Sequence, residues 1–256
     1  MSIFCDSYPA LAKQETLFIH GNLASTKWWA PTLTAWKKSG SQGSASLHFA
    51  DWRGCGQNPP WPADQPFTLT DLARDFLQLM DQKELKKVSL VGHSLGGLIA
   101  LQIMCLQPER IERAVLLDPV SARGVVFDDG MYEAFRQMAA SRELTRTVIL
   151  STIHHSENLN EGDKEAYTDD AFKAVKGIGS SVLEILKSVD LSEDAARVRV
   201  PTLILHGEKD AVLPIADSEK LAALLPKSQF ERLVNAGHCW NVEDPEAFTK
   251  RVRSFL

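Results

Sequence analysis

A serine flanked by glycines is the first group in this sequence whose surroundings suggest chemistry. Residues 92–96 read GHSLG, with an apolar run before them and a helical pattern after them. A serine in the sharp turn between a strand and a helix exposes its hydroxyl at the carboxyl edge of a sheet, and flanking glycines let backbones approach closely. The pattern predicts that Ser94 is a nucleophile; the alternative is a glycine-rich turn with no chemical role.

A serine hydroxyl attacks well only when a nearby base removes its proton. Among the seven histidines, His238 is the preferred base, because it lies in the loop between the last predicted strand and the last predicted helix. Such a loop can bring an imidazole over the carboxyl edge of the sheet. His20 and His206 stand beside glycines at strand ends and are interpreted as structural, and the His93 side chain is expected to point away from Ser94.

The imidazole needs a carboxylate that fixes its tautomer and stabilises its charged form. Asp210 follows a predicted strand at 202–207, and Asp118 ends another at 114–118, so both are candidates for the same edge. We prefer Asp210, because it gives the chain order Ser, Asp, His that accompanies this kind of serine turn. Asp118 is then interpreted as a turn residue before Pro119.

An acyl-transfer intermediate carries a negative oxygen that needs two hydrogen-bond donors. One expected donor is the backbone N–H of Leu95, at the N-terminus of the helix after Ser94, where the helix dipole also favours negative charge. The other is the backbone N–H of Asn22, in the loop after the first apolar strand. A simple turn at Gly21 and Asn22 is the alternative.

Short apolar runs alternate with amphipathic helical patterns along most of the chain. This alternation predicts an α/β fold with a mostly parallel, doubly wound sheet, since continuous apolar strands suit a sheet covered on both faces. A stretch at 39–46, rich in Gly and Ser, is predicted to be a surface loop. Helices are predicted at 69–80, 95–107 and 245–256, and strands at 16–20, 46–51, 88–92, 114–118, 202–207 and 230–234.

The alternation stops between residues 119 and 200, where only helical patterns occur, mainly at 128–146 and 169–189. Ordinary connections in a sheet of this kind span about 2–6 residues, so this segment is an insertion. We predict a core formed by residues 1–118 and 201–256 and a helical lid at 119–200. Extra packing at the periphery is the alternative to a lid.

The composition is that of an ordinary globular protein, with 256 residues, 44% hydrophobic and 24% charged residues and a net charge of −5. The mild acidity argues against a nucleic-acid partner. The absence of a signal-peptide pattern or a long apolar run, and four scattered cysteines, predict no membrane association and a cytoplasmic location. We expect no cofactor and no metal, because His154 and His155 would splay apart on a helix. The sequence leaves a monomer or a homodimer open.

Five segments in this order resemble the alpha/beta-hydrolase superfamily, specifically its lid-bearing branch of esterases, lactonases and carbon–carbon-bond hydrolases. They are HGN (20–22), DWRGCG (51–56), GHSLGG (92–97), HGEKD (206–210) and GH with a following EDP (237–245). The resemblance implies the alpha/beta-hydrolase fold with its lid after the sixth strand. Related dehalogenases and epoxide hydrolases carry aspartate at the nucleophile position, so Ser94 argues against both. Only about 15 residues precede the first predicted strand, which leaves the family's N-terminal hairpin and its usual eight-strand count open.

Two tryptophans, Trp28 after the predicted Asn22 donor and Trp240 after His238, are candidates for substrate contact, with ordinary packing as the alternative. They would suit an apolar or aromatic acyl group. Together the residues predict a serine hydrolase that cleaves a small carboxylic ester, thioester or lactone through an acyl-enzyme intermediate. The expected partner is a small-molecule, ester-like substrate. The alternatives are a carbon–carbon-bond hydrolase and a ligand-binding receptor with negligible turnover.

Overall fold

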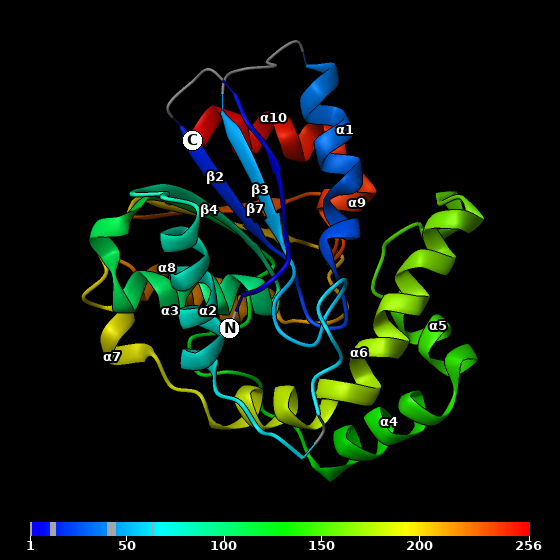
Figure 1. Ribbon diagram of the computed structural model, residues 1–256. Coiled ribbons are helices and arrows are strands. Elements are labelled where there is room, and N and C mark those ends of the chain that lie inside the picture. Colours follow the sequence, from blue (N-terminus) through cyan, green and yellow to red (C-terminus); the bar gives the residue numbers. More distant parts are fainter. Residues whose placement is uncertain (1, 11–13, 40–44, 63) are drawn as a thin grey trace.

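Apolar runs that are buried on both faces form the centre of a seven-stranded sheet (Figure 1). The computed structural model describes residues 2–10, 14–39, 45–62 and 64–256, so most of the surface loop predicted at 39–46 lies outside the described residues. The sheet order is β1-β3-β2-β4-β5-β6-β7, from β1 (Cys5–Tyr8), β2 (Glu15–Ile19), β3 (Ser46–Ala50), β4 (Val88–His93), β5 (Ile111–Leu117), β6 (Thr202–Gly207) and β7 (Ser228–Leu233).

Strands β2 to β7 run parallel, and β1 pairs antiparallel with β3 at one edge of the sheet. The mostly parallel α/β sheet predicted from the sequence is therefore confirmed. The sequence pattern did not predict β1, because its four residues are exposed or half-buried and form no apolar face. With one strand ahead of β2, the described sheet has seven strands.

Helices cover both faces of the sheet, so alternate residues of a central strand enter different cores. In β2, Leu17 belongs to one core and its neighbour Phe18 to the other. One face carries α2 (Leu69–Gln82), α3 (Leu95–Leu106) and α8 (Ile215–Leu224), and the opposite face carries α1 (Ala30–Lys38) and α10 (Pro245–Phe255) (Figure 1).

The segment between β5 and β6 contains helices and no strand, and every residue from 119 to 200 is described. Its helices are α4 (Asp129–Ala140), α5 (Arg142–Ser151), α6 (Glu161–Ser188) and α7 (Ser192–Ala195). In chain order this segment follows the fifth strand, not the sixth, which corrects the position implied by the family resemblance. The difference arises because the described chain has a single strand, β1, ahead of β2.

Two helix boundaries in this segment differ from the prediction for local reasons. The helix predicted at 128–146 is broken at Ser141, whose extended backbone (φ −135°, ψ 109°) ends α4 and whose hydroxyl caps α5 by accepting the Leu144 N–H. The helix predicted at 169–189 begins at Glu161, where Asn160 accepts the Asp163 N–H. None of the helices in the described chain combines the length and the apolar character needed to span a membrane.

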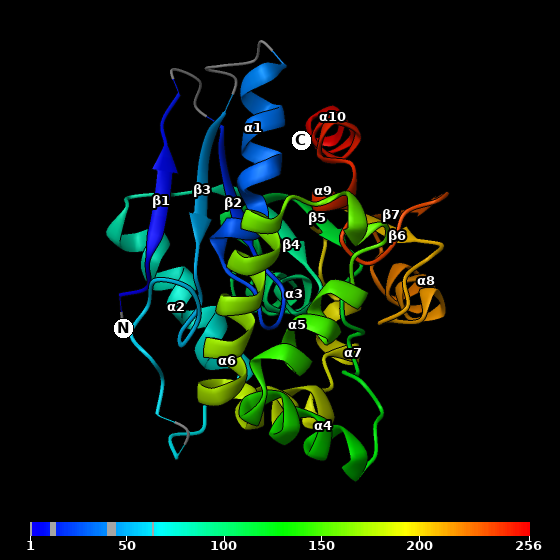
Figure 2. The ribbon, with the colours of Figure 1, turned by 90° about the vertical axis from the view of Figure 1, so that its right-hand side faces the viewer.

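Polar contacts connect α6 to the loops that follow β2 and β3. Asp170, which is 6% exposed, accepts hydrogen bonds from the Ser25 hydroxyl at 2.5 Å and the Lys27 ammonium at 2.8 Å. Lys173 donates to the carbonyl of Gly56 at 2.5 Å. Helices α4, α5 and α6 lie together at the end of the sheet toward which β2 and β3 point (Figures 1 and 2).

The polar contacts between α5 and α6 are ionic and lie at the surface. Arg142 pairs with Glu165 and Asp169, each at 2.6 Å, and Arg146 pairs with Glu161 at 2.8 Å. Exposed ion pairs contribute only about 0–1 kcal/mol each and weaken in salt. The polar contacts of α5 are therefore weaker than those that hold α6 through the buried carboxylate of Asp170.

We predict that Gly96→Ala destabilises the fold. A Cβ at this position would lie 2.2 Å from the carbonyl oxygen of Ile19 and 2.5 Å from that of His20, both backbone atoms that cannot turn away. Overpacking of this kind costs about 1–3 kcal/mol, measured as a loss of unfolding free energy in urea. The control is Gly162→Ala, near the start of α6, where the only near contact is the Asn160 side chain at 3.1 Å. Equal stability of Gly96→Ala and the wild type would contradict the prediction.

Candidate active site

The turn between β4 and α3 holds Ser94 in a backbone conformation that is unfavourable for any residue with a side chain. Its φ is 53° and its ψ is −120°, at a cost of order 1–3 kcal/mol that surrounding packing must offset. The Ser94 N–H donates to the carbonyl of Leu117 on β5 at 2.9 Å. A Cβ on Gly92 would lie 2.5 Å from the carbonyl oxygen of Gly96, so the turn closes this tightly only with glycine there.

A pocket of about 370 Å³ opens over this turn, and both Ser94 and His238 line it. The helices of the inserted segment supply one wall, which is mostly apolar. The lining includes no Lys, Arg, Asp or Glu among the described residues. The wall from the insertion consists of Met131, Phe135 and Met138 of α4 and Val148, Ile149, Ser151 and Thr152 at α5.

His238 is held by a carboxylate on the side away from the pocket. Its Nδ1 donates to Asp210 Oδ2 at 2.8 Å, and both side chains are almost completely buried. The other carboxylate oxygen, Oδ1, accepts the backbone N–H groups of Val212 at 2.6 Å and Leu213 at 3.0 Å. Burial alone would raise the pKa of Asp210, but the hydrogen bond and charge of His238 and these N–H groups outweigh it, so the pKa lies below its ordinary value.

The structure therefore pairs His238 with Asp210 and not with Asp118, the competing candidate. Among the described side chains, Asp118 makes no hydrogen bond to His238; its Oδ1 instead accepts the backbone N–H of Gly207 at 2.8 Å. The Ser94 hydroxyl makes no hydrogen bond to any described residue, although it shares the pocket with His238. Nucleophile–base hydrogen bonds are often long in a protein without substrate and tighten when substrate binds.

His93 supports His238, a role that the sequence analysis missed. Its Nε2 donates to the backbone carbonyl of His238 at 2.8 Å, and the residue lines the pocket next to Ser94. Burial, together with the charge of His238, lowers the pKa of His93 to about 3, so the imidazole is neutral and a fixed donor. The sequence alone could not predict this contact, because the two residues are 145 positions apart and the place of the His238 loop in the fold was not known.

The two predicted oxyanion donors come from separate parts of the chain that meet at the serine turn. Leu95 is the first residue of α3, so its N–H has no acceptor within the helix. Asn22 lines the pocket. The loop that carries it lies close to the turn, because a Cβ on Gly21 would be 3.1 Å from the Ser94 Cβ. The same loop is fixed by Asp51, whose Oδ1 accepts the Thr26 N–H at 2.6 Å.

The two candidate tryptophans have different positions. Trp28 lines the pocket and stacks on Tyr167 of α6, with ring centroids 4.4 Å apart. Trp240 does not line the pocket, which corrects the prediction that it contacts substrate. It begins α9 (Trp240–Glu243) and packs edge-on against Phe248 of α10, in the core on the opposite face of the sheet.

A cluster of Asp118, His206 and Asp210 resembles a metal-ligand set, since one ligand atom from each lies within 4.8 Å of the others. However, both ring nitrogens of His206 are already used by the protein. Nε2 donates to the carbonyl of Leu213 at 3.2 Å, and Nδ1 accepts the Ser218 hydroxyl at 2.8 Å. The cluster therefore offers a metal no free imidazole nitrogen.

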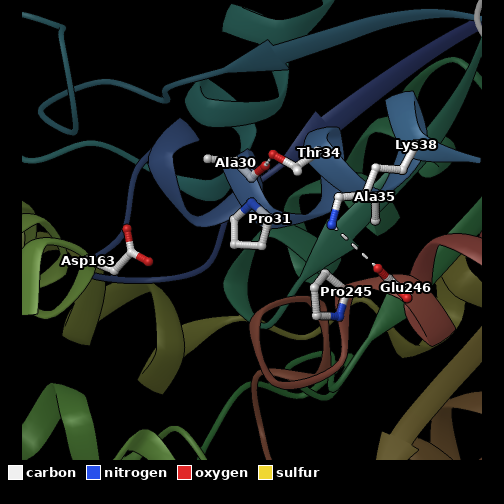
Figure 3. Close-up of a pocket in the computed structure, with 8 residues that line it drawn as sticks. All are labelled: Ala30, Pro31, Thr34, Ala35, Lys38, Asp163, Pro245 and Glu246. Carbon is white, nitrogen blue, oxygen red and sulfur yellow. Dashed lines mark hydrogen bonds and ion pairs between the residues drawn. The ribbon is translucent and has the colours of Figure 1, made fainter. Parts of the chain in front are cut away.

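A second hollow, between α1 and α10 and near the start of α6, lacks groups for catalysis (Figure 3). Its lining includes Pro31 and Pro245, and the exposed ion pair of Lys38 with Glu246 crosses it at 3.6 Å. Asp163 lies on the other side of the hollow. Because no nucleophile and base meet there, the pocket over Ser94 is the better candidate.

Comparison with known proteins agrees with the fold. The profile of a family described as alpha/beta hydrolase fold matches residues 17–245. RutD of Pseudomonas savastanoi pv. phaseolicola, named as a carbamate hydrolase, is 26% identical over 91% of this chain and 89% of its own length. The carboxylesterase YbfK of Bacillus subtilis is 26% identical over 94% of this chain and 79% of its own. The solved esterase EaEST of Exiguobacterium antarcticum superimposes with a TM-score of 0.86, at 21% identity, over 99% of this chain and 94% of its own.

We predict that His93→Leu lowers stability and that His93→Gln restores part of the loss. Leucine leaves the buried carbonyl of His238 without its donor, at a cost of about 1–3 kcal/mol in unfolding free energy. Glutamine has an amide N–H that can reach the same carbonyl. Urea unfolding of the three proteins measures the effect. Equal losses for the two variants would indicate that the hydrogen bond does not hold the His238 loop.

Proposed function

The chain belongs to the alpha/beta hydrolase fold family, and from this premise we propose that it is a serine hydrolase of small, uncharged carboxylic esters, thioesters or lactones. The observation that carries the proposal is the hydrogen bond between His238 and Asp210, at the edge of a pocket that Ser94 also lines. This arrangement supplies a nucleophile, a base and a carboxylate that fixes the base. We propose that the helical segment at 119–200 acts as the lid of this pocket, on the core formed by residues 1–118 and 201–256.

The proposed reaction begins with proton transfer from Ser94 to His238. Because Nδ1 is held as an N–H by Asp210, Nε2 of the neutral imidazole carries the lone pair that accepts this proton. The serine oxygen attacks the carbonyl carbon, and the backbone N–H groups of Leu95 and Asn22 stabilise the resulting oxyanion. When the carbon–oxygen or carbon–sulfur bond of the substrate breaks, His238 returns the proton to the leaving group.

The second half of the reaction releases the acid from the enzyme. Water, deprotonated by His238, attacks the acyl-enzyme carbonyl, and the same two N–H groups stabilise the second oxyanion. The serine oxygen leaves and regains its proton from His238. Asp210 stays ionised throughout, which agrees with the downward shift of its pKa.

The character of the pocket supports an uncharged substrate. An ionised acyl group loses hydration on entering an apolar pocket and needs a cationic partner to offset that loss. None of the described lining residues is a Lys or an Arg. A neutral aliphatic or aromatic acyl group instead gains from contact with Met131, Phe135 and Trp28.

We predict that Ser94→Ala lowers kcat/KM for a short p-nitrophenyl ester by at least about 10³-fold, because the hydroxyl is the attacking group. Folding should be unchanged, since the Ser94 side chain makes no hydrogen bond to described residues and alanine is smaller. Steady-state hydrolysis and thermal unfolding measure the two effects.

The matched control is Ser89→Ala, a buried serine in β4, the strand that precedes the turn of Ser94, that does not line the pocket. Its turnover should equal that of the wild type. If Ser94→Ala keeps full activity, the nucleophile is assigned wrongly. If the wild type cleaves no member of a broad panel of esters and lactones, a ligand-binding receptor is the better interpretation, and cleavage of carbon–carbon substrates alone would favour the other alternative.

We also predict that p-nitrophenyl butyrate is preferred over p-nitrophenyl hemisuccinate, whose acyl group carries a carboxylate. Met131→Lys places a cation at the pocket wall, at a position that is already 37% exposed and can accommodate a charged side chain. A partly exposed charge pair contributes up to about 1 kcal/mol, so the preference for butyrate should fall about fivefold. Met131→Gln is the uncharged control. Faster hydrolysis of hemisuccinate by the wild type would exclude the uncharged substrate class.

A further inference from the structure

Asp118 is a buried carboxyl group that the proposed reaction does not use. It directly follows β5, is 0% exposed and is held at a positive φ of 43°. One oxygen, Oδ1, accepts the Gly207 N–H, but Oδ2 is buried and receives no hydrogen bond from any described residue. An ionised carboxylate whose buried oxygen has no hydrogen-bond donor destabilises the folded state, because no group replaces the water that the oxygen loses on folding.

Within the described part of the chain, no neighbouring cation offsets a negative charge on Asp118. His206 Nδ1 lies 3.6 Å from Asp118 Oδ1, but this imidazole is neutral, because Nδ1 accepts the Ser218 hydroxyl while Nε2 donates to a carbonyl. Burial lowers the pKa of His206 as well. The other titratable groups near Asp118 are Asp210, from the loop after β6, Glu243 of α9 and the buried thiol of Cys239, and none of them is a cation. Among the described residues, Asp118 forms no ion pair with Lys or Arg.

The proximity of Asp118 and Asp210 determines which of them carries the proton. One oxygen of each carboxyl group lies within 4.8 Å of an oxygen of the other, so two negative charges would repel each other strongly in this buried site. Asp210 accepts three N–H groups, from His238, Val212 and Leu213, whereas Asp118 accepts one. Burial, and then the charge of Asp210, raise the pKa of Asp118 well above its ordinary value.

We propose that Asp118 is a neutral carboxylic acid that donates a hydrogen bond to the carboxylate of Asp210, and that it is a positioning residue for the pair of Asp210 and His238. The effect of Asp118 on catalysis rests on the proposed function, whereas the protonation of Asp118 is independent of it. The donated bond orients the carboxylate toward His238 and withdraws part of its negative charge.

The first test compares pH profiles of kcat/KM for the wild type, Asp118→Asn and Asp118→Ala. The asparagine amide can donate to Asp210 and its oxygen can accept the Gly207 N–H, so this variant should match the wild type within about threefold, with an unchanged acidic limb. Alanine removes the donor, so Asp210 holds the protonated His238 more strongly and the acidic limb moves to higher pH. If the role of Asp118 were merely structural, the pH at which kcat/KM of Asp118→Ala falls on the acidic side would equal that of the wild type.

The result that would overturn the proposal is a shift of the Asp118→Asn limb to lower pH. That shift is expected if Asp118 is ionised, because the substitution would then remove a negative charge that stabilises protonated His238. Asparagine also tolerates a positive φ better than alanine does, so Asp118→Asn remains informative if Asp118→Ala fails to fold.

A second test does not depend on activity. A carboxyl group with a raised pKa in the folded protein keeps its proton there and loses it on unfolding, so the native state binds more protons above about pH 4, the ordinary pKa of Asp. The stability of the wild type is then reduced as pH rises, and Asp118→Asn lacks this effect. The unfolding midpoint of Asp118→Asn relative to the wild type should therefore increase from pH 4 to pH 8.

A constant difference between the two midpoints across this range would show that Asp118 is not protonated and would end the proposal. Because both proteins are compared by unfolding alone, the outcome is readable even if no ester is cleaved. Absence of turnover in the wild type would instead count against the proposed function, so the two failures are distinguishable.

Discussion

The hydrogen bond from His238 to Asp210 determines what the other groups at the carboxyl edge of the sheet can do. It fixes which ring nitrogen carries the proton, and so leaves on the other one the lone pair that the proposed reaction needs. The contact forms because β6 and β7 are parallel neighbours, so the loops that follow them begin at the same edge of the sheet. Parallel pairing of this kind, more than any local sequence preference, brings together residues that lie 28 positions apart in the chain.

Much of this arrangement could be predicted from sequence because it follows from apolar runs and turn chemistry. The parallel strands are continuous apolar segments, and the serine turn is marked by glycines that close packing requires, as the contact of Gly92 with the Gly96 carbonyl illustrates. The acid was harder to identify, since Asp118 and Asp210 both follow strands. The structure distinguishes them by which carboxylate accepts the hydrogen bond of His238, and the spacing of residues in the sequence does not encode that choice.

The features that sequence did not predict depend on tertiary contacts. β1 is short and half exposed, so it has no apolar signature and exists because β3 offers an edge. The break at Ser141 interrupts a pattern that reads as one helix, because a serine can be either a helical residue or a cap. Trp240 follows His238 closely in sequence but packs in the core on the opposite face of the sheet. His93 supports a loop 145 residues away.

The way in which α6 is attached affects how the pocket can open. Asp170 connects this helix to Ser25 and Lys27, in the loop that also carries Asn22, so a displacement of α6 would disturb the groups beside Ser94. The chain just after α5 is attached to the loop of His238: the Thr152 carbonyl accepts a hydrogen bond from the Cys239 thiol at 3.6 Å, and the His154 N–H donates to Glu243 Oε1 at 3.0 Å. Because α6 is attached to the loop of Asn22 and the chain after α5 is attached to the loop of His238, a movement of either helix that widens the entrance also disturbs the groups beside Ser94.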